Sequence, residues 1–113
     1  TSERLKIKLR EILDTVSDEY NLEFEGNAES FITKPGEWSE IVRDAVRDIT
    51  GHTPEYTTNG GTSDARFVVQ HCPVIECGGV NESIHQVNEN AKISDLEQLT
   101  DIYERILLRY FAD

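Results

Sequence analysis

Residues 37–51 read EWSEIVRDAVRDITG, and this stretch has the clearest amphipathic helical pattern in the chain. Its apolar side chains recur every three or four residues, which places them on one face of a helix. Those side chains are Trp38, Ile41, Val42, Ala45, Val46 and Ile49. Gly51 follows directly and is the residue type that most often ends a helix in the left-handed conformation. The pattern predicts a helix over residues 37–50 whose apolar face lies in the core.

Two further long helices are predicted, one toward each end of the chain. Residues 2–20 carry apolar positions at helical spacing between charged residues, and Ser2 can cap the start. Ser94 and Glu97 have the spacing of a capping box, and the apolar residues after them again follow the helical period. A short fourth helix is expected around residues 67–69.

Short extended segments separate these helices. Residues 22–25 alternate apolar and charged side chains, 31–33 form a second short piece, and 74–77 are apolar and β-branched. Helices that alternate with strands indicate the α/β class, with three main helices and about four short strands. A sheet this small leaves exposed edges, which suits a piece of a larger domain.

Composition excludes several classes of protein. The net charge of −11 over 113 residues argues against a nucleic-acid partner and against an anionic membrane surface. No apolar run is long enough to span a membrane, and no signal peptide is visible, so a cytoplasmic protein is expected. Cys72 and Cys77 lack the spacing of a zinc knuckle. One disulfide is arithmetically possible, but the apolar surroundings of Cys77 favour a buried free thiol.

A glycine-containing loop precedes the expected short helix. Residues 57–64 read TTNGGTSD, and Gly60 and Gly61 allow close approach to the backbone. Together with the hydroxyl groups of Thr62 and Ser63, the N–H groups at the start of a helix would form a cradle for a carboxylate. An ordinary capped turn explains the same residues equally well.

A second polar loop contains the strongest candidate for a metal ligand. Residues 78–90 read GGVNESIHQVNEN and place His85 among polar neighbours. Neutral imidazole is a common zinc ligand, although spacing alone favours an ordinary surface histidine. A zinc site needs three or four ligands, so one histidine does not complete it. His52 and His71 match no such pattern and are expected at the surface or in packing.

Three motifs in order resemble one family of enzymes. They are GGTSDARF at 60–67, VIECG at 74–78 and N-x-x-I-H-x-V-N-E at 81–89. In this order and at this spacing they resemble the C-terminal segments of the bacterial succinyl-diaminopimelate desuccinylases, cytoplasmic two-zinc amide hydrolases. The resemblance implies a C-terminal fragment of a two-domain zinc hydrolase. Residues 1–33 would end the lid or dimerisation domain, and residues 34–113 would form the C-terminal part of the catalytic domain.

The same resemblance assigns roles to individual residues. His85 would hold one of two zinc ions, with cobalt as a possible substitute. Gly61 and Thr62 would contact a substrate carboxylate, and Asn81 would hold the amide region of the substrate. No catalytic residue is expected in this segment, because the general base and the remaining ligands belong to the N-terminal half of such enzymes.

The activity implied is hydrolysis of N-succinyl-LL-2,6-diaminopimelate to succinate and LL-diaminopimelate, in lysine and cell-wall precursor synthesis, by a homodimer. The 113-residue chain alone is expected to be inactive. It starts with Thr1 and has no methionine. Removal of a leading methionine or excision from a longer chain would explain this start equally well, and the resemblance favours excision. Departures such as Ala65 in place of glycine and the charged Glu82 leave the acyl preference open.

Several alternatives to this activity remain. Within the superfamily they are an acetylornithine deacetylase, another aminoacylase or a dipeptidase. Outside enzymes, the acidic surface and the amphipathic end helices also suit an interaction module, or a fragment that associates with itself to cover apolar surface.

Overall fold

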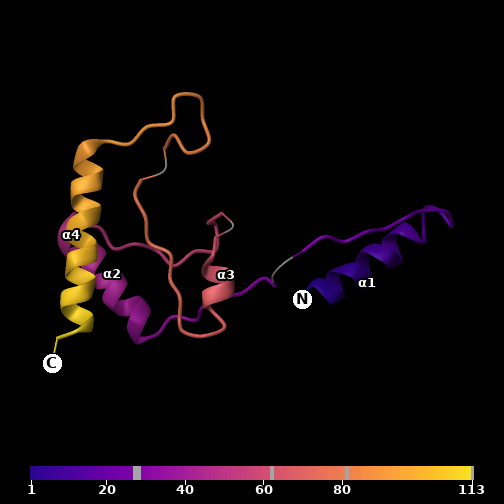
Figure 1. Cartoon of the computed structure of the whole chain (residues 1–113), viewed down its shortest axis with the longest axis horizontal. Helices are drawn as coiled ribbons and strands as arrows, with labels where there is room; N and C mark the ends of the chain where they lie inside the picture. Colours follow the sequence, from indigo (N-terminus) through magenta and orange to yellow (C-terminus); the bar gives the residue numbers. More distant parts are fainter. Residues whose placement is uncertain (27–28, 62, 81, 113) are drawn as a thin grey trace.

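The computed structural model describes residues 1–26, 29–61, 63–80 and 82–112. Four helices form within them: α1 (Ser2–Leu13), α2 (Glu37–Thr50), α3 (Ala65–Val68) and α4 (Ile93–Tyr110). Figure 1 shows α2 and α4 side by side, whereas α1 projects away from them on the other side of the molecule. The three predicted long helices and the short fourth one all form, although the first ends at Leu13 rather than at residue 20 and the short helix begins two residues before Phe67.

The predicted short strands are wrong, and the α/β class is not confirmed. Residues 22–25, 31–33 and 74–77 run without helical turns, but none of the described residues belongs to a strand. A strand exists only where its N–H and C=O groups pair with a neighbouring segment in a ladder. The alternation and β-branching in these segments reflect an extended backbone, and the described residues give that backbone no ladder.

The core lies between α2 and α4, and the apolar face of α2 packs into it as predicted. Its buried apolar residues are Val42, Ala45, Ile102 and Ile106, and Ala45 is fully buried at the contact between the two helices. At one end of this contact, the rings of Trp38 and Tyr110 meet edge to face with centroids 5.4 Å apart. Arg109 forms an ion pair with Asp48 across the same interface. This helix pair is the framework to which the loops of the site are attached.

The ends of α2 follow from local sequence. The Ser39 hydroxyl accepts a hydrogen bond from the Gly36 N–H and donates one to the Gly36 carbonyl, both at 2.8 Å. Gly51 ends the helix with φ 74°, and its N–H donates to the Arg47 carbonyl at 2.8 Å. The predicted stop at Gly51 is therefore confirmed.

The ends of the other long helices differ from prediction. The capping box at Ser94 is wrong, because the N-cap of α4 is Lys92, two residues earlier, and Ser94 already lies within the helix. Ser2 is the first residue of α1 rather than its cap, and its N–H and hydroxyl donate to the Glu29 carboxylate. These bonds lower the pKa of Glu29 and satisfy a free donor at the helix start.

The N-terminal arm, residues 1–26, makes its own small set of contacts. Leu9 and Leu13 of α1 and Leu22 and Phe24 of the returning segment are half-buried, and the Lys6 ammonium lies 5.6 Å from the Phe24 ring centroid. Because the arm extends away from α2 and α4, the radius of gyration is 19.5 Å. A compact domain of this length would have about 13 Å. The division of domains at residues 33 and 34 stays a prediction.

No helix among the described residues has the length and apolar character needed to cross a membrane.

Candidate functional site

The loop that contains His85 has an unusual backbone. His85 has φ 60° and Asn88 has φ 64°, so two residues close together adopt the left-handed conformation. That conformation is uncommon outside glycine, although histidine and asparagine adopt it more readily than most residues. The His85 side chain is exposed, as a side chain that binds a ligand from outside the loop must be.

The side chain of Ser83 closes this loop. Its hydroxyl donates to the Asn90 carbonyl at 2.7 Å and accepts from the Asn90 N–H at 3.0 Å. Inside the closed loop, the Gln86 N–H donates to the Ser83 carbonyl at 3.0 Å and the Glu89 N–H donates to the Gln86 carbonyl at 3.2 Å. We call residues 83–90 the His85 loop. The sequence did not single out Ser83, since no local pattern links a serine to the backbone of a residue seven positions later.

The His85 loop contains one candidate metal ligand rather than a complete site. Among the described residues, no three His, Cys, Asp or Glu side chains lie close enough together to hold a metal ion. An exposed neutral imidazole fits zinc as a single ligand, so the other ligands of such a site must come from elsewhere. His52 differs, because its Nδ1 lies 2.9 Å from the Thr50 carbonyl, and His71 is exposed on another segment.

The candidate substrate cradle is only partly described. Thr62 and Asn81 lie outside the described residues, whereas Gly61 is exposed and lines a wide cleft of about 880 Å³. Residues 57–61, Arg66 and residues 74–76 are among those that line the same cleft. A Cβ added to Gly60 would lie 3.6 Å from a carboxylate oxygen of Glu76, so the two residues are close neighbours. The cleft therefore offers both a guanidinium and a carboxylate to a ligand.

The helix after this cradle contributes little dipole. α3 has four residues, and its N-cap is the acidic Asp64. The Ser63 hydroxyl accepts a hydrogen bond from the Ala65 N–H at 3.1 Å, as in an ordinary turn. A helix macrodipole builds up over several turns, so backbone approach at Gly61 is a better physical basis for the predicted carboxylate site than the helix start.

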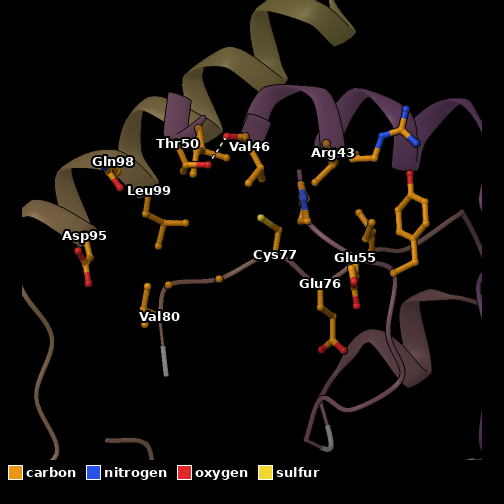
Figure 2. A pocket seen from close by; sticks show the side chains of 17 residues that line it. Arg43, Val46, Thr50, Glu55, Glu76, Cys77, Val80, Asp95, Gln98 and Leu99 are labelled. Carbon is orange, nitrogen blue, oxygen red and sulfur yellow. Dashed lines mark hydrogen bonds between the residues drawn. The ribbon is translucent and has the colours of Figure 1, made fainter. Parts of the chain in front are cut away.

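Residues 74–80 connect the core to the His85 loop. Figure 2 shows the Cys77 side chain directed toward α2 and the Glu76 side chain directed away from it. The Tyr103 hydroxyl of α4 donates to the Cys77 carbonyl at 2.7 Å and holds this segment on the helix pair. Burial raises the pKa of the Cys77 thiol. Both cysteines are free, and Cys77 is half-buried, so the expected free thiol is confirmed while its burial is partial.

Comparison with known proteins gives a consistent assignment. Residues 3–109 match the model of Peptidase family M20/M25/M40. The chain is 46% identical over 112 residues to succinyl-diaminopimelate desuccinylase of Rhodospirillum centenum, which covers 99% of this chain and 29% of the relative. It is 45% identical over 111 residues to the protein of the same name from Xanthobacter autotrophicus, covering 97% of this chain and 30% of the relative. The chain thus spans less than a third of the length of these curated relatives.

Proposed function

Because the chain belongs to the peptidase M20/M25/M40 family, we propose that it forms part of a metal-dependent succinyl-diaminopimelate desuccinylase. The reaction is hydrolysis of N-succinyl-LL-2,6-diaminopimelate to succinate and LL-diaminopimelate. The observation that carries the proposal is the identity to proteins of that name, which extends over nearly the whole chain. The relatives described above do not favour the acetylornithine deacetylase alternative.

In this proposal the His85 loop supplies one metal ligand. Its imidazole binds zinc in the neutral form, and cobalt is an alternative metal. Two such metal ions in the complete enzyme would, when bound, lower the pKa of a coordinated water and polarise the amide carbonyl. The general base and the other ligands lie outside this segment, so the 113-residue chain alone is inactive.

The substrate is bound beside the metal by the glycine loop. The Gly61 N–H approaches a substrate carboxylate, with Thr62 beside it, and Asn81 holds the amide region. The exposure of Gly61 in a cleft supports this placement, because the backbone there is open to a ligand. Cleavage in the cytoplasm by a homodimer completes the proposal. The apolar side chains exposed on α1, such as Leu5 and Ile12, are compatible with a contact made by residues 1–33.

The test compares two substrates and two histidines. The longest natural polypeptide that contains these residues is purified with zinc and assayed on succinyl-diaminopimelate and on acetylornithine. Cleavage of the succinyl substrate is expected, and His85→Ala should lose it together with about one equivalent of metal. His71→Ala is the matched control, because His71 is exposed but lies outside the loop. Preference for acetylornithine would overturn the proposed substrate, and full metal content in His85→Ala would overturn the proposed role of His85 as a metal ligand.

A further inference from the structure

We infer that Ser83 is a positioning residue, which holds the backbone of the His85 loop in the conformation that presents His85 to the metal. The inference rests on the proposed function for the role of His85. It goes beyond that function by assigning the geometry of the ligand to a residue that touches neither the metal nor the substrate.

The first support is the pair of hydrogen bonds between the Ser83 hydroxyl and the backbone of Asn90, which we call the clasp. One atom, the Ser83 hydroxyl oxygen, both donates to the Asn90 carbonyl at 2.7 Å and accepts from the Asn90 N–H at 3.0 Å. A hydroxyl is the small side-chain group that can donate and accept from the same atom. Both partners are backbone atoms, so the clasp requires a hydroxyl at position 83 and makes no demand on the side chain at position 90.

The second support is the backbone that the clasp encloses. His85 at φ 60° and Asn88 at φ 64° both lie between Ser83 and Asn90. Residues in such sparsely populated conformations persist only where surrounding interactions hold them. When φ returns to negative values, the direction of the Cα–Cβ bond changes relative to the loop. The imidazole would then leave the position from which it reaches the metal.

The third support is that hydrophobic packing does not hold the loop. Val87 is 92% exposed and Ile84 is 46% exposed, so the apolar side chains of the loop do not bury it against α2 and α4. Hydrogen bonds within residues 82–90 are therefore the main constraint on its shape. One further bond, from the Gln86 side-chain amide to the Glu82 carbonyl at 3.0 Å, spans the turn that contains His85.

These observations separate positioning from stability. The loop contributes none of the four buried apolar residues of the core, so loosening it should leave the fold intact. Its effect should appear in metal affinity, because the apparent dissociation constant rises as the competent fraction of the loop falls. If one loop in ten remains competent without the clasp, affinity falls about tenfold. Outer residues that orient metal ligands commonly account for about 10–100-fold.

The experiment measures zinc affinity rather than turnover. The longest natural polypeptide containing these residues is titrated with zinc against a chelator, and the site lost in His85→Ala identifies the ion held by His85. Ser83→Ala should weaken that site about tenfold, and Ser83→Thr, which keeps the hydroxyl, should stay within about twofold of the original. Ser94→Ala is the matched control, because it removes an exposed hydroxyl near the start of α4 and should change nothing.

Each outcome decides between positioning and a merely structural role. Weakened zinc binding in Ser83→Ala, with an unchanged melting temperature of the metal-free protein and rescue by threonine, supports the inference. Unchanged zinc affinity in Ser83→Ala, alongside loss of the site in His85→Ala, overturns the inference and leaves the proposed function standing. A threonine variant as weak as the alanine variant also overturns it. Retention of the site in His85→Ala instead refutes the role of His85 as a metal ligand, and with it the inference that rests on that role.

Discussion

Truncation of Ile106 tests whether the contact between α2 and α4 organises this chain. Ile106 is 6% exposed and belongs to the core, whereas Leu108, two residues later on the same helix, is 63% exposed. The two side chains have the same number of carbon atoms, but Ile106 lies in the core and Leu108 lies largely in water. Ile106→Ala and Leu108→Ala therefore form a matched pair in which burial is the main variable.

The expected cost follows from the groups removed. Ile→Ala deletes three carbon groups, and each buried group contributes about 0.8 kcal/mol, which gives about 2.4 kcal/mol. The cavity left behind raises the total to about 3 kcal/mol. Ile106→Val deletes one group and should cost about 1 kcal/mol. Leu108→Ala should stay within about 0.5 kcal/mol, because that side chain is already largely in water.

Urea unfolding measured by tryptophan fluorescence provides the assay. Trp38 is the single tryptophan and packs edge to face on Tyr110 of α4, so its emission reports separation of the two helices. With a urea dependence of about 1–3 kcal/mol per molar, Ile106→Ala should lower the midpoint by about 1–3 M. Equal shifts for Ile106→Ala and Leu108→Ala would refute the packing of α2 on α4 described above.

Two further predictions concern a helix end and a thiol. Gly51→Ala should destabilise by about 1 kcal/mol in the same unfolding assay, because φ 74° is strained for alanine even though the space there is open. Gly78→Ala, also in open space but without a positive φ, should be close to neutral, and equal effects at the two positions would contradict this reasoning. For alkylation, the thiolate is the reactive form, so the raised pKa of Cys77 lowers its reactivity at about pH 8. Exposed Cys72 should be alkylated first, and mass spectrometry of the digested protein should show the alkylation rate of Cys77 approaching that of Cys72 as pH rises. Equal alkylation rates for the two cysteines at every pH would contradict this prediction.

The sequence was most informative where structure depends on local interactions. The helix over residues 37–50 was predicted to its ends, because its apolar period and Gly51 act within one or two turns. The helix at the N-terminus was predicted too long. The Thr15 hydroxyl donates to the Ile12 carbonyl at 2.6 Å, and Val16 beyond it is 80% exposed, so its position in the apolar pattern had no packing partner.

Features that depend on distant segments were less predictable. Residues 74–77 have the composition of a strand, but composition cannot specify the neighbour that a ladder requires. His85 was identified as a candidate through family resemblance, and its role stays a prediction. Its left-handed backbone was not foreseen, because no periodic pattern encodes such a conformation, and the bonds between Ser83 and Asn90 that enclose it join residues seven positions apart.

The shape of the His85 loop bears on how the proposed metal site would be assembled from separate segments. A loop that folded only around its ion would lose conformational entropy at the moment of binding, and that cost would weaken affinity. Here the bonds from Ser83 to Asn90 and the turn from Ser83 to Gln86 are made by atoms of the loop itself. Under the proposed function, the conformation of His85 would therefore be set before any ligand from another segment arrives. Metal binding would then have to bring separate ligands together, but it would not also have to fold this loop.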